Sequence, residues 1–204
     1  MGRVVFDISM SLDGYMTAAG QTAEEPLGPG GQRLNEWAFG TDEQNRSYLA
    51  DQVAGLGAVI TGRTTYDTSL PWWDADGPSG PARRPVFVLT HTVPDDSPAD
   101  GVYTFVVDGV ESALRQARAA AGDQVVCIMG GADVGQQFLA AGLVDEVSVH
   151  LIPVLFGAGT RMFDHLGPDH RQLEALDAVA TPTAIHTRFR VVKANSSEGT
   201  AGPQ

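Results

Sequence analysis

Cysteine and positive charge are the scarcest features of this 204-residue sequence. Its single cysteine, Cys127, permits neither an internal disulfide nor a cysteine-based metal cluster. Thirteen lysines and arginines stand against 25 aspartates and glutamates, so the formal charge is −12 and the pI is about 4.6. Nucleic acids and anionic membranes bind basic protein surfaces and repel acidic ones. We therefore expect neither as a partner of this acidic chain.

Long apolar runs are also missing. No segment approaches the roughly 18 consecutive apolar residues of a membrane span, and the first eleven residues carry only Arg3 as a positive charge. Together with the single cysteine, this predicts a cytoplasmic protein. With 43% hydrophobic and 19% charged residues the composition is globular, and we expect one domain over residues 1–193. The small, polar residues 194–204 are predicted to be a disordered tail.

Short apolar runs alternate with helical patterns along most of the chain. Strands are predicted at residues 4–9, 58–61, 86–89, 102–107 and 125–129. Such alternation is typical of an α/β fold with a mostly parallel sheet between helices. In the last third, residues 173–179 and 184–192 flank a Thr-Pro-Thr turn, which predicts an antiparallel hairpin at one edge of the sheet.

One helix and one loop near the N-terminus have clear signals. The stretch Thr41-Asp42-Glu43-Gln44 resembles a capping box that starts a helix. The buried stripe of that helix is predicted from four residues at helical spacing: Tyr48, Leu49, Val53 and Leu56. The Gly- and Pro-rich residues 20–40 predict an irregular loop with Trp37 and Phe39 packed beneath it.

Two strand ends carry residues suited to phosphates. Gly62-Arg63-Thr64-Thr65 offers a guanidinium and hydroxyls at a helix start, and Gly130-Gly131-Ala132-Asp133-Val134 offers two glycines that let a backbone approach a ligand closely. Each segment alone has a simpler interpretation. The two glycines can form an ordinary turn, and the arginine can be a solvated surface residue. Their combination favours a dinucleotide. The Gly-x-Gly-x-x-Gly spacing of an ordinary Rossmann domain is absent after the first strand.

Hydride transfer also needs an acid, and two aspartates are candidates. Asp7 interrupts the apolar strand at residues 4–9, where burial is expected to raise the pKa of its carboxyl toward a catalytic value. The alternative is that Asp7 faces solvent or pairs with a neighbouring strand. Asp13 is the second candidate, with a structural role in its loop as the favoured interpretation. The five histidines share no metal-ligand spacing, and no metal site is predicted.

Five ordered motifs resemble the dihydrofolate reductase-like family: Ser11-Leu12-Asp13-Gly14, Thr61-Gly62-Arg63-Thr64-Thr65-Tyr66-Asp67, Met129-Gly130-Gly131, Gly142-Leu143-Val144-Asp145-Glu146 and Pro153-Val154-Leu155-Phe156-Gly157-Ala158-Gly159-Thr160-Arg161-Met162-Phe163. Within it, the chain is similar to the branch that contains the reductase (C-terminal) domain of bifunctional riboflavin-biosynthesis deaminase-reductases. The resemblance spans residues 4–192.

This resemblance implies an NADPH-dependent reductase with a three-layer α/β/α fold and a roughly eight-stranded sheet. It also implies a set of cofactor contacts. In the motif that begins at Gly62, the adenosine 2′-phosphate would face Arg63 and Thr64, and the pyrophosphate would face Thr65. The pyrophosphate would be held by Gly130, Gly131, Ala132, Asp133 and Val134. The adenosine side would be lined by Leu89, Thr90 and His91, and the nicotinamide would be flanked by Ser9 and Met16. The loop of Asp13 would act as a flap over the ring.

The family pattern is broken at two places that bear on the substrate. Arg46 stands at the spacing where folate reductases have a carboxylate, and Tyr15 stands where the riboflavin reductase domains have a basic residue for the ribose phosphate. Those domains also lack the Gly-Arg-Thr-Thr-Tyr motif. Tyr15 and Trp37 are the candidate substrate contacts, although Trp37 is also interpreted as a core residue.

The functional expectation is therefore a reductase that transfers a hydride to the C=N or C=O bond of a small heterocyclic or sugar-linked substrate, related to 5-amino-6-(5-phosphoribosylamino)uracil reductase. Two alternatives stay open: the riboflavin-pathway reductase itself, and a non-catalytic nucleotide- or flavin-binding module. We expect a homodimer, because family members commonly associate and the C-terminal sheet edge needs covering.

Overall fold

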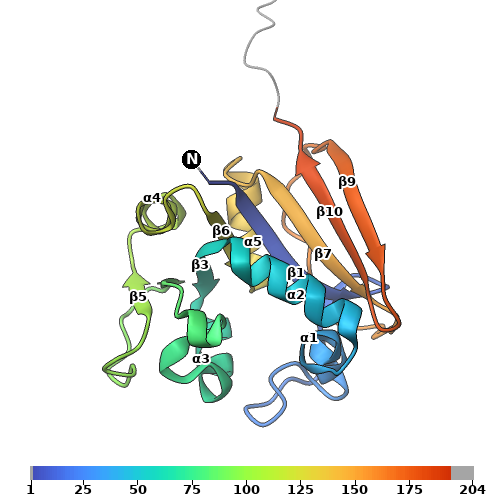
Figure 1. Ribbon diagram of the computed structural model, residues 1–204, viewed down its shortest axis with the longest axis horizontal. Coiled ribbons are helices and arrows are strands. Elements are labelled where there is room, and N and C mark those ends of the chain that lie inside the picture. The colour runs from blue at the N-terminus through green and yellow to red at the C-terminus, as the bar shows by residue number, and fades with distance from the viewer. Residues whose placement is uncertain (1, 194–204) are drawn as a thin grey trace, which may run out of the picture.

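A computed structural model describes residues 2–193 of the chain. Eight of its ten strands form one sheet in the order β5-β4-β3-β6-β1-β7-β10-β9, and β2 pairs with β8 (Figure 1). The strands are β1 Val4–Ser11, β2 Tyr15–Ala18, β3 Leu56–Gly62, β4 Val86–Leu89, β5 Tyr103–Val106, β6 Val125–Met129, β7 Glu146–Ile152, β8 Gly159–Arg161, β9 Leu173–Ala180 and β10 Ile185–Val191. The α-helices are α1 Glu36–Phe39, α2 Glu43–Gly55, α3 Arg63–Trp73, α4 Val110–Ala121 and α5 Ala132–Ala140.

The sheet is parallel from β5 to β7 and antiparallel at one edge. Strand β1 lies in its middle and pairs in parallel with β6 on one side and β7 on the other. Strand β10 runs antiparallel to β7, and β9 runs antiparallel to β10. The predicted α/β fold and C-terminal hairpin are thus confirmed.

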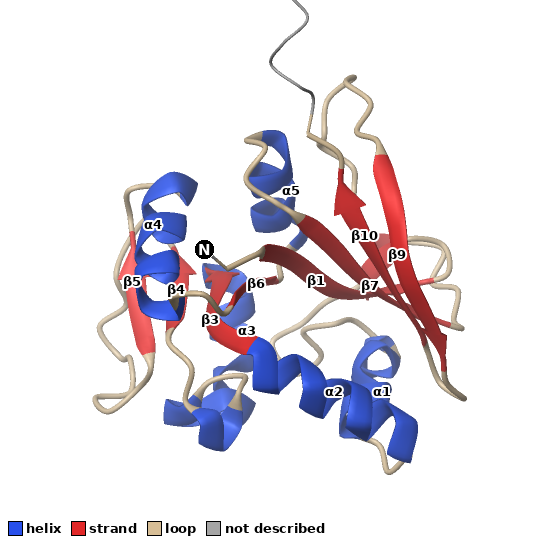
Figure 2. Ribbon diagram, turned by 45° about the horizontal axis from the view of Figure 1, so that its top comes forward, coloured by secondary structure: helices blue, strands red, loops and turns tan. Residues whose placement is uncertain are grey.

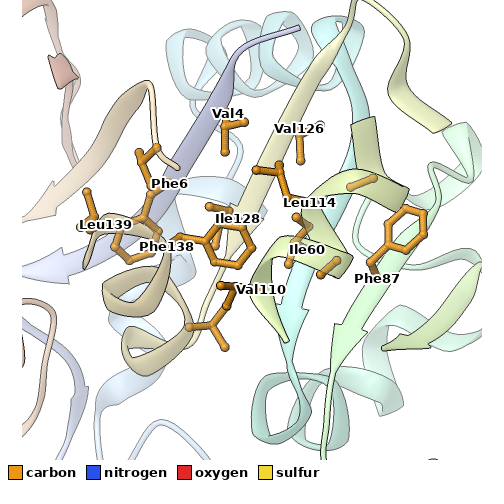
Figure 3. Close-up of a cluster of buried hydrophobic side chains, with 14 of the residues drawn as sticks. Val4, Phe6, Ile60, Phe87, Val110, Leu114, Val126, Ile128, Phe138 and Leu139 are labelled. Atoms are coloured by element: carbon orange, nitrogen blue, oxygen red, sulfur yellow. The ribbon is translucent and has the colours of Figure 1, made fainter. Parts of the chain in front are cut away.

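Helices cover both faces of the sheet (Figure 2). On one face α4 and α5 enclose the main hydrophobic core, shown in Figure 3. Alternate residues of β1 point into it, so Val4 and Phe6 are fully buried there. Phe6 packs beside α5 at Gly135, which has no Cβ that could meet the Phe6 ring. Burying a side chain such as Phe6 stabilises the fold by about 1.5–3 kcal/mol.

The opposite face, under α1 and α2, is built differently from the sequence prediction. Helix α2 is capped by Asp42, whose side chain accepts a hydrogen bond from the Asn45 amide, so the cap lies one residue after Thr41. Three residues of the expected apolar stripe, Tyr48, Leu49 and Val53, are only half-buried, and the fourth, Leu56, is buried but belongs to β3. The one buried residue of α2 is the polar Asn45. Polar groups of the sheet, described below, lie under this helix and explain the difference.

Three further expectations can be compared with the fold. Phe39, expected beneath the loop, is 84% exposed, because α1 turns only its Trp37 toward the sheet. Within residues 2–193 no helix is long and apolar enough to cross a membrane. The predicted disordered tail, residues 194–204, lies outside the described residues.

Replacing Gly135 by alanine tests the packing of α5 against β1. An added Cβ would lie 2.0 Å from the Phe6 ring. We expect Gly135→Ala to lower the free energy of unfolding, measured by urea titration, by about 1–3 kcal/mol. Gly55 in α2 has open space around it. Gly55→Ala is therefore the matched control and should be neutral or stabilising by up to about 1 kcal/mol. Equal effects of the two variants would contradict the described packing.

Candidate active site

The two predicted phosphate-binding segments meet at the ends of neighbouring strands. Strands β3 and β6 pair in parallel, and the Gly62 amide donates to the Gly130 carbonyl over 3.2 Å. The Thr61 hydroxyl donates to the carbonyls of Met129 and Gly130, at 2.8 and 3.1 Å. These bonds hold the start of α3 beside the start of α5, where the amides of both first turns are available to a ligand.

Glycine is needed at this junction for reasons of space and backbone conformation. Gly130 has a φ of 59°, and it is joined to Gly131 by a cis peptide bond. A Cβ at Gly130 would lie 3.2 Å from the Thr65 hydroxyl, and one at Gly62 would lie 2.9 Å from the Val134 side chain. Thr65 of the first segment therefore lies against Gly130 and Gly131 of the second.

The remaining residues of the second segment differ in what they can offer. Ala132 and Val134 are buried, so only their backbone amides can reach a ligand. Asp133 is exposed at the start of α5 and accepts a hydrogen bond from Gln137. Its carboxylate stabilises the helix start electrostatically.

Arg63 connects the start of α3 to the loop that follows β4. Its Nε donates to both carboxylate oxygens of Asp67, at 2.7 and 2.9 Å, and its Nη1 donates to the Thr92 carbonyl at 3.1 Å. The Thr90 hydroxyl donates to the same carbonyl at 2.7 Å. The guanidinium therefore lies beside the loop that follows β4, where Leu89 and Thr90 are half-buried and His91 and Thr64 are exposed. Asp67, which orients Arg63, was not predicted from the sequence as its partner.

Asp13 fastens its loop to a distant segment. Its carboxylate accepts hydrogen bonds from the Ser11 hydroxyl at 2.6 Å and from the amides of Phe156 and Gly157 at 3.2 and 2.7 Å. The Ser11 hydroxyl is the main cause that lowers the pKa of Asp13 to about 2, with the two amides contributing. A carboxylate with these partners stays ionised at neutral pH and holds the loop in place, as the structural interpretation expected.

Tyr15 and Met16 follow this loop in β2. Tyr15 is buried and donates to the Gly157 carbonyl over 3.2 Å. The Arg161 guanidinium lies 4.5 Å above the Tyr15 ring, and its Nη2 donates to the Tyr15 hydroxyl at 2.9 Å. A positive charge is thus present beside Tyr15, although it comes from β8. Met16 is half-buried.

A buried polar network lies between α2 and the sheet, and its histidines were not singled out from the sequence. His150 Nε2 is 3.1 Å from Asp7 Oδ1, and His150 Nδ1 is 2.9 Å from His186 Nδ1. His186 Nε2 is 3.0 Å from Asn45 Oδ1, and Asn45 Nδ2 donates to the Thr183 hydroxyl at 2.8 Å. Hydrogen bonds therefore link β1, β7, β10 and α2 in one chain.

Aromatic rings enclose the two histidines. The Trp37 ring is centred 4.2 Å from His150 and 4.7 Å from His186, and Tyr48 stacks on His186 at 4.1 Å. The Trp37 indole donates to the Ser9 hydroxyl at 2.9 Å. Trp37 is 6% exposed, so its ring acts here as core packing against the histidines.

The pKa of Asp7 corrects the sequence expectation. Burial raises it, but the charge interaction with His150 and hydrogen bonding to His150 and Ser148 outweigh burial, so the pKa lies below its usual value. Burial, together with the neighbouring His150, lowers the pKa of His186 to about 4. The expected rise at Asp7 was wrong because the histidine partner was not anticipated.

Two buried hydroxyls point to further polarity in this region. Tyr48 Oη and Ser148 Oγ have no partner of normal hydrogen-bond geometry among residues 2–193. Burial raises the pKa of Tyr48. Ser148 nevertheless contributes hydrogen bonding to both Asp7 and Tyr48, so the two hydroxyls extend the buried polar network beside Asp7.

A sequence signal for the network did exist. Glu146, Ser148 and His150 occupy every second position of β7, and His186 and Arg188 do so in β10. Side chains at alternate positions share one face of a sheet, so this pattern indicates a polar face. No three His, Cys, Asp or Glu residues in the described part of the chain are grouped so that they could hold a metal ion.

Comparisons with known proteins agree with this architecture. Uncharacterized protein YwjB of Bacillus subtilis (strain 168) is 23% identical over 170 residues, which cover 80% of this chain and 84% of YwjB. A putative riboflavin biosynthesis protein from Shewanella sp. PV-4 aligns with a TM-score of 0.70 at 23% identity, over 95% of this chain and 100% of that one. Dihydrofolate reductase from Enterococcus faecalis, complexed with NADP(H) and RAB-propyl, aligns with a TM-score of 0.60 at 16% identity, over 94% of this chain and 98% of that one.

The structural likenesses show a dihydrofolate reductase-like fold, as the resemblance of the motifs implied. The family model described as RibD C-terminal domain matches residues 3–187, nearly the whole described chain. The chain therefore belongs to the RibD C-terminal domain family.

Proposed function

We propose that this protein is an NADPH-dependent reductase that transfers a hydride to a C=N or C=O bond of a small heterocyclic or sugar-linked substrate. The observation that carries the proposal is the junction of β3 and β6, where the Gly62 and Gly130 segments meet. Membership in a reductase family and the NADP(H) bound to the similar Enterococcus enzyme support it.

The residues at the junction fit a dinucleotide. The amides that begin α5, with Thr65 above Gly130, suit a pyrophosphate, and the glycines leave no side chain between it and the backbone. Arg63, held by Asp67 beside Thr90, suits the 2′-phosphate that distinguishes NADPH from NADH. When bound, the nicotinamide supplies the hydride. Ser9 and Met16 remain the proposed neighbours of that ring.

Asp7 is the proposed source of the proton that accompanies the hydride. In the sheet Asp7 pairs with Met129, the residue directly before Gly130 and the proposed pyrophosphate site. Its side chain is 20% exposed, so it can contact a bound molecule. Asp13 acts through its loop, which it locks to residues 156 and 157, and not as an acid.

A second candidate is the reductase step of riboflavin biosynthesis itself, with 5-amino-6-(5-phosphoribosylamino)uracil as substrate. Tyr15 disfavours it, since a basic residue is expected there. Arg161 favours it, because its guanidinium lies over the Tyr15 ring and is half exposed. A phosphate on the substrate would find a positive charge at that place.

The third possibility, a non-catalytic nucleotide- or flavin-binding module, separates from both reductases in a simple assay. Such a module would bind a nucleotide but would not oxidise NADPH, whichever substrate is added. The buried polar network around Asp7, which lowers the pKa of this carboxyl, favours a catalytic site over a binding module.

Substitution of Arg63 tests the cofactor assignment. Loss of charge-assisted hydrogen bonds worth about 1.5–3 kcal/mol predicts that Arg63→Ala weakens NADPH binding about 10- to 100-fold in a fluorescence titration. NADH, which lacks the 2′-phosphate, should lose little affinity. Arg190→Ala, an exposed arginine on β10, is the control and should leave both affinities unchanged. Failure of the unaltered protein to bind NADPH would sink the proposal.

Arg161 allows a test of the second candidate. If 5-amino-6-(5-phosphoribosylamino)uracil is the substrate, Arg161→Ala should raise its KM about 10- to 100-fold with little change in kcat, because a charged hydrogen bond to the phosphate is lost. Steady-state kinetics of NADPH oxidation measure both constants. No turnover of this compound by the unaltered protein would retire the candidate and leave the broader reductase proposal standing.

A homodimer is proposed from the C-terminal edge. Seven of the eight residues of β9 are exposed, and Val179 and Ile185 are apolar side chains at the surface of this hairpin. An uncovered edge strand invites pairing with a second copy. Light scattering at micromolar concentration should give about twice the 21.5 kDa monomer mass. A mass near that of the monomer would refute the dimer.

A further inference from the structure

The network under α2 joins a partly exposed carboxylate to two almost inaccessible imidazoles. The Asp7 side chain is 20% exposed, whereas that of His150 is 3% exposed and His186 is fully buried. Asp7 is therefore the only one of the three that can contact a bound molecule. Any proton held by the histidines reaches such a molecule through Asp7.

The positions of the hydrogens follow from the donor at the far end. Asn45 Nδ2 donates to Thr183, so Asn45 Oδ1 faces His186 and must accept from its Nε2. Burial lowers the pKa of His186 to about 4, so this histidine is neutral at physiological pH. With its one hydrogen on Nε2, its Nδ1 carries none and must accept a hydrogen bond from His150 Nδ1. The one hydrogen of a neutral His150 is then used at Nδ1.

A neutral His150 would therefore turn a bare Nε2 lone pair toward the Asp7 carboxylate 3.1 Å away. Two acceptors facing each other repel, so this contact needs one more hydrogen. We propose that the contact between Asp7 and His150 Nε2 stores one exchangeable proton, and that His186 and Asn45 position it there by fixing His150 Nδ1 as a donor.

The consequence for chemistry rests on the proposed reductase function. A hydride from the nicotinamide would form the new C–H bond, and the stored proton would pass from His150 Nε2 through the Asp7 carboxyl to the nitrogen or oxygen of the substrate. His150 would be left neutral and Asp7 ionised. After product release, a proton from water would restore the store through the exposed side of Asp7. Asp7 is the catalytic acid in this account, and the two histidines are positioning residues.

The surrounding groups are compatible with a charge on the pair. Cys127 of β6 and Tyr48 of α2 face Asp7, and burial raises the pKa of both groups, so both are neutral at physiological pH. Arg188 of β10 is paired with Asp177 and lies 4.0 Å from Glu146. The other packed side chain, Trp37 of α1, carries no charge. The added proton therefore forms an ion pair with Asp7 and is not opposed by an unpaired cation.

Nitrogen-15 NMR of protein labelled at histidine tests the store without any ligand. At neutral pH we expect a hydrogen on each nitrogen of His150, with the Nε2 hydrogen shared with Asp7, while His186 carries its single hydrogen on Nε2. A scalar coupling across the hydrogen bond should join the two Nδ1 nuclei. A His150 whose only hydrogen is on Nε2, beside a His186 with its hydrogen on Nδ1, would overturn the proposal.

Substitution of Asp7 gives a second, independent result. Asp7→Asn removes the carboxylate that shares the hydrogen on His150 Nε2, so at neutral pH the Nε2 signal should move to the range of a nitrogen without hydrogen. His170→Gln, at an exposed position outside the network, is the matched control and should leave the His150 signals unchanged. An unchanged Nε2 signal in Asp7→Asn would show that the proton is not shared with Asp7.

The proton store and the reductase proposal can fail separately. The NMR experiment needs no cofactor, so a shared proton in a protein that binds no NADPH would leave the store standing and remove its catalytic use. NADPH binding with two neutral histidines would leave the reductase standing and overturn the store.

Discussion

The central position of β1 is the constraint on which the rest of the structure depends. Its parallel pairing with β6 sets Asp7 beside Met129, and its parallel pairing with β7 sets Ser9 beside His150. The same strand turns Phe6 into the core on the opposite face. One strand therefore carries the apolar contact that supports α5 and the polar contact that the proposed chemistry uses, on alternate residues.

The polar face under α2 differs in kind from the core under α4 and α5. A sheet face that buries Ser148, His150 and His186 loses the stabilisation that apolar side chains of similar size would give, and it needs partners for each polar atom. The partners are supplied largely within the network, which Ser148 extends to Asp7 and Tyr48. Such a cost is typical of functional sites, and here it falls next to the one accessible carboxylate of the network.

The fold and the meeting of the Gly62 and Gly130 segments were predictable because they depend on local patterns. Apolar runs indicate the strands, and the pairs Gly62-Arg63 and Gly130-Gly131 mark where two of them end. Parallel strands bring such ends to one edge of the sheet. The network was harder, because Asp7, His150 and His186 meet only through pairing between segments far apart in the sequence. The sequence gives no spacing for such contacts. For the same reason it misled on the pKa of Asp7, where the partner outweighs burial.

A crystal structure of the protein with NADP⁺ would test the central claim most directly. The account predicts the pyrophosphate against the amides that begin α5, the 2′-phosphate on Arg63, and the nicotinamide ring beside Asp7 with its reactive carbon on the α2 side of the sheet. A cofactor bound elsewhere would contradict it. So would a nicotinamide ring placed so far from Asp7 that one small substrate could not contact both.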